Sequence, residues 1–132
     1  MGISNVIDYV TVATAGNATD FGDLTTATRS LAGLSNTTRG VFGGGITGSG
    51  DVNTIEYVTI QTTGNATDFG DLTTARETSG NSGNATRGLF HGTYVNSDAG
   101  KVIDYITIAS TGNATDFGDL TVARTASGTS GT

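Results

Sequence analysis

One ten-residue string, Gly-Asn-Ala-Thr-Asp-Phe-Gly-Asp-Leu-Thr, occurs three times in this 132-residue chain. The copies occupy residues 16–25, 64–73 and 112–121. Their asparagines stand at 17, 65 and 113, so 65 − 17 and 113 − 65 are both 48. Because chance does not place an identical string at a fixed period, each copy must occupy the same place in a repeated structural unit.

Composition favours a folded β-structure and excludes several classes of protein. The chain has 21 Gly but no Cys, which rules out disulfides and thiolate metal sites. Runs such as Val-Ile-Asp-Tyr-Val-Thr-Val at 6–12 argue against a disordered, Gly-rich segment. A net charge of −6 repels phosphate backbones, so we expect no nucleic-acid partner. No signal peptide opens the chain and no apolar run is long enough for a bilayer, so we expect no membrane insertion.

A first strand type is rich in apolar residues on both of its faces. In the first copy, Val6 and Val10 point one way while Ile7 and Tyr9 point the other. We therefore expect this strand to lie in a sheet sandwiched between neighbouring sheets. The pattern predicts it in three places: 5–13, 54–61 and 102–109. One position is acidic in every copy, which predicts a solvated edge or a partner for an arginine: Asp8, Glu56 and Asp104.

The repeated string follows this strand. Its Gly-Asn pair tolerates positive φ and predicts a tight hairpin turn. The returning strand carries one large apolar side chain per copy, which we expect to be buried at equivalent positions: Phe21, Phe69 and Phe117. The glycine after each phenylalanine predicts a close approach by a neighbouring unit: Gly22, Gly70 and Gly118.

A polar link with an arginine then leads into a stretch of small residues, which suits a crowded strand where several sheets converge. The arginines of this link are Arg29, Arg76 and Arg124. A further strand follows at 38–45 and again at 86–93. The connection back to the first strand type differs most between copies, 46–53 against 94–101, and variable loops on a repeated scaffold are where binding usually resides.

Four short strands within 48 residues match one blade of a β-propeller, an array of four-stranded antiparallel sheets. The predicted fold is therefore all-β, a single repeat domain over 1–132 with copies at about 5–52, 53–100 and a partial 101–132. We expect no helix longer than a turn. Since 132/48 is about 2.75 units and propellers typically have 4–8 blades, we expect self-association to close the ring. A cyclic homodimer is favoured over a trimer; further repeats of a longer protein are the alternative.

The order of features resembles the kelch repeat. A kelch unit has an arginine, a small-residue inner strand, an apolar strand ending in paired glycines, a strand with tyrosine and an outer strand with tryptophan. The corresponding residues here are Arg29, 30–35, Val41-Phe42-Gly43-Gly44, Tyr57 and Phe69. Three features differ from the kelch pattern: Phe replaces Trp, His91-Gly92 replaces paired glycines in the second copy, and the spacing from Tyr to the aromatic is longer.

The repeated string, together with Thr-Arg-Gly-Val-Phe-Gly-Gly-Gly at 38–45, looks most like the kelch-like repeats of large virion-associated proteins of tailed phages from marine cyanobacteria. That resemblance implies a structural or adhesion role at the virion surface or tail. It also implies a virion or extracellular-surface location.

No catalytic constellation appears, so we expect neither enzyme activity nor a cofactor. Asp20 and Asp23 point to opposite faces of an extended strand and do not converge as a catalytic pair, although calcium binding by these aspartates stays open. The one histidine lacks a Cys or a second His for a transition-metal site. Three departures from the repeat are candidate ligand-binding residues, although neutral drift explains them equally well: His91, Tyr94 and Asp98.

Two non-catalytic function classes follow. The first is the structural or adhesion module implied by the resemblance, with a host-surface glycan or protein as partner. The second is a multivalent, lectin-like propeller in which each blade gap repeats one weak glycan site.

Overall fold

Strands build the fold of the described residues, which in this computed structural model are 2–93, 98–124 and 130–131. The first half of the chain forms β1 (Ser4–Tyr9), β2 (Thr19–Thr28), β3 (Ala32–Ser35), β4 (Arg39–Gly43), β5 (Ile46–Thr47) and β6 (Gly50–Asp51). The second half forms β7 (Thr54–Thr59), β8 (Thr67–Asp71), β9 (Gly80–Gly83), β10 (Arg87–His91), the 3-10 turn η1 (Asp98–Gly100), β11 (Val102–Thr107), β12 (Thr115–Asp119) and β13 (Ser130–Gly131). The all-β class is confirmed, and η1 is the longest helical segment within these residues.

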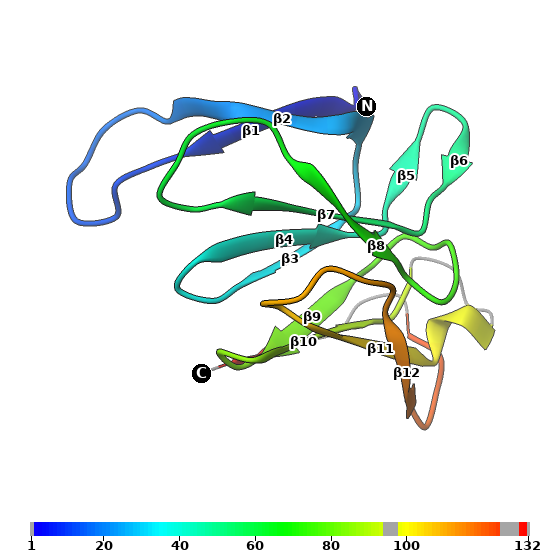
Figure 1. The fold of residues 1–132 in the computed structure, drawn as a ribbon. Helices are drawn as coiled ribbons and strands as arrows, with labels where there is room; N and C mark the ends of the chain where they lie inside the picture. The colour runs from blue at the N-terminus through cyan, green and yellow to red at the C-terminus, as the bar shows by residue number, and fades with distance from the viewer. Residues whose placement is uncertain (1, 94–97, 125–129, 132) are drawn as a thin grey trace.

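Three sheets lie one above another, with the small β5-β6 hairpin beside them (Figure 1). The first sheet pairs β1 with β2, the central sheet has the order β3-β4-β7-β8, and the third has the order β12-β11-β10-β9-β13. Neighbouring strands are antiparallel, except that β13 runs parallel to β9. The central sheet takes two strands from the predicted copy 5–52 and two from 53–100, so one sheet joins two sequence copies.

Among the described sheets, the predicted four-stranded antiparallel blade is found in the central sheet alone. The first sheet has two strands and the third has five, of which β13 is parallel to its neighbour. A closed ring of blades is not found among the described residues, so the complete propeller remains a proposal.

An apolar cluster lies between each pair of adjacent sheets, and we call the two contacts the first and the second junction. Burying such side chains stabilises the stack by about 1.5–3 kcal/mol for each large residue. The cluster of the first junction consists of Phe21, Leu24, Val58 and Ala66. The cluster of the second junction consists of Ala32, Val41, Ile55, Phe69, Leu72, Phe90, Ile106 and Ile108.

No described sheet covers the outer faces of the stack. Val6 and Val10 on β1 and beyond are exposed, so burial of this strand type on both faces fails in the first sheet. On β12, Phe117 is 53% exposed, against 9% for Phe21 and 3% for Phe69. The prediction that all three phenylalanines are buried is wrong for Phe117, because no described sheet covers β12 from outside.

The hairpin turn falls earlier than predicted. The Thr14 backbone N–H donates to the Thr11 carbonyl at 3.0 Å, which turns the chain before the repeated string begins. The same turn recurs where Thr62 N–H donates to the Thr59 carbonyl at 3.1 Å. The prediction that Gly-Asn forms this turn is therefore wrong, and β1 ends at Tyr9 rather than at residue 13.

Candidate functional site

At the first junction, the start of one string docks onto the Phe-Gly-Asp part of the string before it. The Gly64 N–H donates to the Phe21 carbonyl at 2.8 Å. The Ala66 N–H donates to the Asp23 carbonyl at 2.8 Å, and Asn65 Oδ1 accepts a bond from the Asp23 N–H at 3.0 Å. These bonds let the loop after β7 act as an added strand on the edge of the first sheet.

The second junction repeats this arrangement 48 residues later. The Gly112 N–H donates to the Phe69 carbonyl at 2.7 Å, and Asn113 Oδ1 accepts from the Asp71 N–H at 3.1 Å. The Ala114 N–H donates to the Asp71 carbonyl at 2.8 Å. The two junctions thus share one set of backbone contacts.

Glycine is required where the docked loop crosses the strand. A Cβ on Gly22 would clash with the carbonyl oxygen of Gly64, and a Cβ on Gly70 would clash with that of Gly112. The predicted close approach at these two glycines is confirmed. Each string can therefore take part in two junctions. Its Gly-Asn-Ala segment docks on the preceding string, and its Phe-Gly-Asp segment is the edge on which the following string docks.

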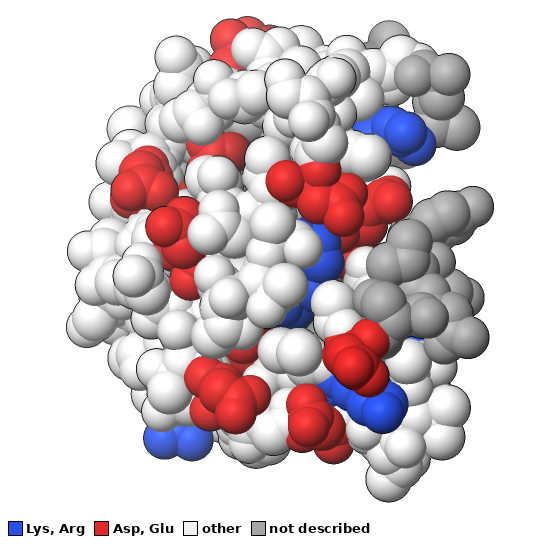
Figure 2. Space-filling model, turned by 90° about the vertical axis from the view of Figure 1, so that its right-hand side faces the viewer, with Lys and Arg blue, Asp and Glu red and all other residues white. Residues whose placement is uncertain are grey.

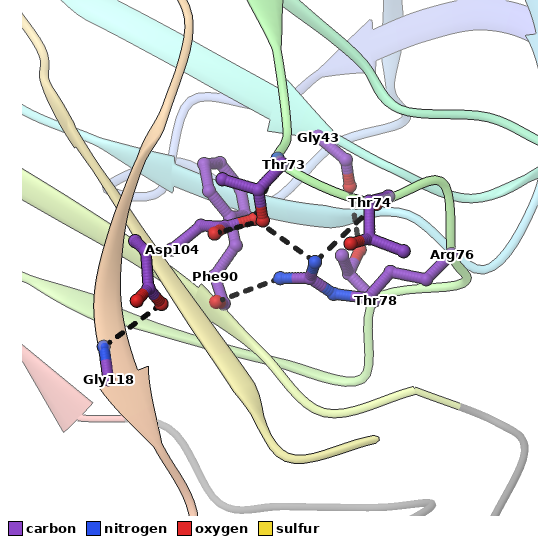
Figure 3. A network of polar contacts seen from close by, with 9 residues as sticks. Gly43, Thr73, Thr74, Arg76, Thr78, Phe90, Asp104 and Gly118 are labelled. Carbon is purple, nitrogen blue, oxygen red and sulfur yellow. Dashed lines mark hydrogen bonds and ion pairs between the residues drawn. The ribbon is translucent and has the colours of Figure 1, made fainter. Parts of the chain in front are cut away.

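The second junction also contains a buried ion pair. Arg76 Nη1 lies 3.0 Å from Asp104 Oδ2, with the arginine side chain 1% exposed. Arg76 Nη2 donates to the Phe90 carbonyl at 3.2 Å, and Nη1 approaches the Thr74 carbonyl at 3.4 Å (Figure 3). Thr73 donates to the same carboxylate through its backbone N–H at 3.1 Å and its hydroxyl at 2.6 Å. The central and third sheets are thereby locked together around one guanidinium group.

Arg29, which the sequence pattern equates with Arg76, is not its counterpart. The residue 48 positions before Arg76 is Thr28. The backbone pairing supports this equivalence: Thr28 pairs with Ser4, and the Arg76 N–H donates to the carbonyl of Val52, the residue 48 positions after Ser4. Arg29 is exposed and its backbone pairs with Ile46. The predicted equivalence is wrong by one residue, because Arg29 stands one position after the place that Arg76 and Arg124 share in the period of 48.

Both ends of the stack carry one uncovered half of a junction. On β12, Phe117 is exposed, and no described residue other than its chain neighbours lies within 4 Å of the position of a Cβ on Gly118. At the other end, Gly16, Asn17 and Ala18 are exposed, although their counterparts at the first junction dock on β2. The molecule thus presents an acceptor edge on β12 and a donor loop before β2.

An aromatic pair recurs on each sheet. The Tyr57 and Phe69 rings meet edge to face with centroids 5.9 Å apart, and the Arg39 guanidinium lies 4.3 Å from the centre of the Tyr57 ring. Beside Tyr57 lies an open hollow of about 320 Å³. Its wall is rich in hydroxyl and amide groups, supplied by Thr59, Thr62, Thr63, Asn65 and Thr67.

The three sequence-predicted ligand residues are placed only in part. His91 ends β10 and is half-buried; burial lowers the pKa of its imidazole below 6.5, and the positive charge of Arg76 lowers it further. Asp98 opens η1 on the surface, 3.7 Å from the Lys101 ammonium group. Tyr94 lies outside the described residues. A ligand role for these residues stays a prediction.

Acidic side chains are spread over the surface. The face drawn in Figure 2 has several groups of carboxylates and fewer basic side chains, in keeping with the net charge of −6. Asp20 lies opposite Asp8 in the β1-β2 register, a neighbour that sequence reasoning missed. Within the described ranges, no group of three or more Asp, Glu or His residues is placed to hold a metal ion. No described helix is long and apolar enough to cross a membrane.

Comparisons with known proteins gave no family model that matches this chain and no match among curated proteins.

Proposed function

We propose that this protein is a non-catalytic structural or adhesion module, built from kelch-like blades, that assembles head to tail through the ends of its sheet stack. The observation that carries the proposal is the pair of uncovered junction halves. The exposed Phe117-Gly118-Asp119 edge has the sequence that receives a loop at both internal junctions, and the exposed Gly16-Asn17-Ala18 loop has the sequence that docks.

A contact between two different patches is heterologous, so it produces a ring if the rotation closes and a filament if it does not. Two chains supply about 5.5 units and three supply about 8, and propellers typically have 4–8 blades. The proposed assembly is a cyclic homodimer, with a trimer as the rival. Its role at a phage virion surface or tail follows from the resemblance to kelch-like phage repeats.

The assembly is tested by light scattering coupled to size exclusion. Ala18→Arg blocks the donor loop and Phe117→Arg blocks the acceptor edge, and both residues are exposed in the single chain. The wild type is expected to be oligomeric and each variant monomeric. A mixture of the two variants is expected to form a 1:1 complex, because one intact donor meets one intact acceptor.

Ile60→Arg is the control, since Ile60 is an exposed apolar residue away from both ends of the stack. It is expected to leave the oligomer intact. A folded wild-type monomer of 13.2 kDa at high concentration contradicts the assembly. Absence of the protein, by mass spectrometry, from purified particles of a phage that encodes it contradicts the virion role.

A lectin-like role is the second candidate, and the hollow beside Tyr57 favours it. Aromatic, hydroxyl and amide groups placed together in a concave site can bind a sugar by apolar contact and hydrogen bonds. A glycan array would identify a bound sugar, and Tyr57→Ala is expected to abolish that signal. An array without signal for the oligomeric protein would remove this candidate.

A further inference from the structure

A second cavity, of about 150 Å³, lies in the first junction. It is formed between the end of β2, the β4 strand and the β5-β6 segment. Apolar walls come from Leu24, Leu31, Phe42 and Val52. Thr25 and Thr26 on its rim are exposed to solvent, so the cavity is accessible from outside. A cavity of this volume is large enough for a compact molecule of about six heavy atoms.

This cavity is the counterpart of the Arg76 site. Four residues make up the Arg76 site at the second junction. The guanidinium contacts Thr74, Phe90 and Asp104, and Thr73 donates to Asp104. The residues 48 positions earlier all line the cavity: Thr25, Thr26, Phe42 and Glu56. The residue in the place of Arg76 is Thr28, which also lines the cavity and whose side chain is too short to fill it.

The acidic group of the site is retained although the arginine is absent. The Glu56 side chain is 6% exposed, and its Oε1 accepts a hydrogen bond from the Thr25 N–H at 2.8 Å. The corresponding bond at the second junction runs from the Thr73 N–H to Asp104 Oδ2. No salt bridge to Glu56 occurs among the described residues. A buried carboxylate in a cavity favours a cation that can also donate hydrogen bonds.

We infer that the cavity binds a guanidinium group supplied by a ligand, in the place that Arg76 fills at the second junction. The carboxylate of Glu56 pairs with the cation, as Asp104 pairs with Arg76. The carbonyls of Thr26 and Phe42 correspond to those of Thr74 and Phe90, which accept from Arg76. The apolar side chains of Leu24 and Leu31 line the space around the group.

This site is independent of the proposed assembly, because it lies inside the first junction and not on the terminal edges. Two sources supply the same chemistry: a small guanidino compound, or an arginine side chain of another protein. The experiment therefore uses two probes, methylguanidinium chloride for the free group and N-acetylarginine methylamide for a side chain on a peptide.

Binding is measured by two-dimensional NMR titration of the full chain at constant ionic strength. Methylguanidinium is expected to produce saturable shifts at residues 25–28, 42 and 56. Glu56→Gln removes the negative charge and is expected to weaken binding about 30-fold or more. Thr28→Arg supplies a tethered guanidinium and is expected to abolish binding while raising the melting temperature. If N-acetylarginine methylamide binds as well, the cavity admits a side chain; if methylguanidinium alone binds, the source is a small compound.

Methylurea is the ligand control, because it has the planar shape of the cation but no charge, and an acceptor oxygen replaces one NH2 group; it is expected not to bind. Arg76→Thr is the reciprocal variant and is expected to bind a second equivalent of methylguanidinium. Equal shifts in the wild type and in Thr28→Arg would overturn the inference. Equal affinity in the wild type and in Glu56→Gln would overturn it as well, and these two variants decide even if Arg76→Thr does not fold.

Discussion

The two junctions of this molecule have the same backbone contacts and different interiors. Loop-to-strand bonds from Gly64 to Phe21 and from Gly112 to Phe69 differ by 0.1 Å in length. Inside the second junction, Arg76 and Asp104 form a buried ion pair. Inside the first, Thr28 and Glu56 leave a cavity of about 150 Å³.

This difference distinguishes the loop-to-strand contacts, which both junctions share, from the side chains between the sheets, which differ. Since the first junction forms without an arginine, the docking of Gly-Asn-Ala on Phe-Gly-Asp does not require the ion pair. The ion pair is an addition that one junction has and the other lacks. Buried ion pairs are weak evidence of net stabilisation, but breaking one is costly because the remaining charge is left unpaired.

The largest expected loss of stability comes from removing an apolar side chain that is buried in a junction. Phe69→Ala is expected to lower the free energy of unfolding by about 3–5 kcal/mol, because Phe69 is 3% exposed and its removal leaves a cavity. Phe117→Ala, at the uncovered edge, is expected to cost less than about 0.5 kcal/mol. Urea unfolding in an Ala18→Arg background, which keeps the chain monomeric, provides both values. Equal losses would show that β12 is covered within a single chain.

The next effect tests the ion pair. Arg76→Met is expected to cost about 3 kcal/mol, the lower end for a broken buried pair, because Thr73 still donates two hydrogen bonds to Asp104. Urea unfolding measures the loss. Arg29→Met is the matched control, and this exposed arginine is expected to change stability by less than about 0.5 kcal/mol. A larger loss from Arg29→Met would restore the alignment of Arg29 with Arg76.

A smaller effect tests whether the docking is the same at both junctions. Asn65→Ala and Asn113→Ala each remove an acceptor of a backbone N–H and are expected to cost about 1 kcal/mol apiece. Asn17→Ala, on the free donor loop, is expected to leave the monomer unchanged and to weaken self-association. Paired unfolding and light-scattering measurements distinguish the two effects. Clearly unequal costs at 65 and 113 would contradict a shared docking mode.

The smallest expected effect is pH-dependent and belongs to the second junction. The pKa of His91 is lowered in the folded state by burial and then by Arg76, so below about pH 6.5 the unfolded chain binds the proton more readily. The free energy of unfolding is therefore unaffected by His91 above pH 6.5. It falls as the pH drops from 6.5 towards the folded pKa, and His91 changes it no further below that pKa. His91→Gln is expected to remove that part of the pH profile. An unchanged difference between wild type and variant from pH 7.5 to 5 would contradict it.

Sequence alone predicted the local properties of the repeat. The β-branched and aromatic runs predicted the all-β class, and the period of 48 predicted the recurrence of contacts. Of the three phenylalanines expected to be buried, Phe21 and Phe69 are, each with a close backbone approach beside it. These features follow from β-propensity, side-chain size and the absence of a Cβ in glycine, which are intrinsic properties of each residue type. The pairing of Arg76 with Thr28 in the repeat also follows from the period, because 76 − 48 = 28.

Tertiary structure decided which side chains are buried and which strand each loop contacts. The three strings are identical, yet Phe69 is buried and Phe117 is exposed, because burial requires a second sheet that the string itself does not contain. The Gly-Asn-Ala segment has the composition of a tight turn, but it docks on the preceding sheet, where unpaired backbone groups on a strand edge accept it. The exposure of a side chain and the partner of a loop are properties of non-local packing, which a local pattern of residues cannot specify.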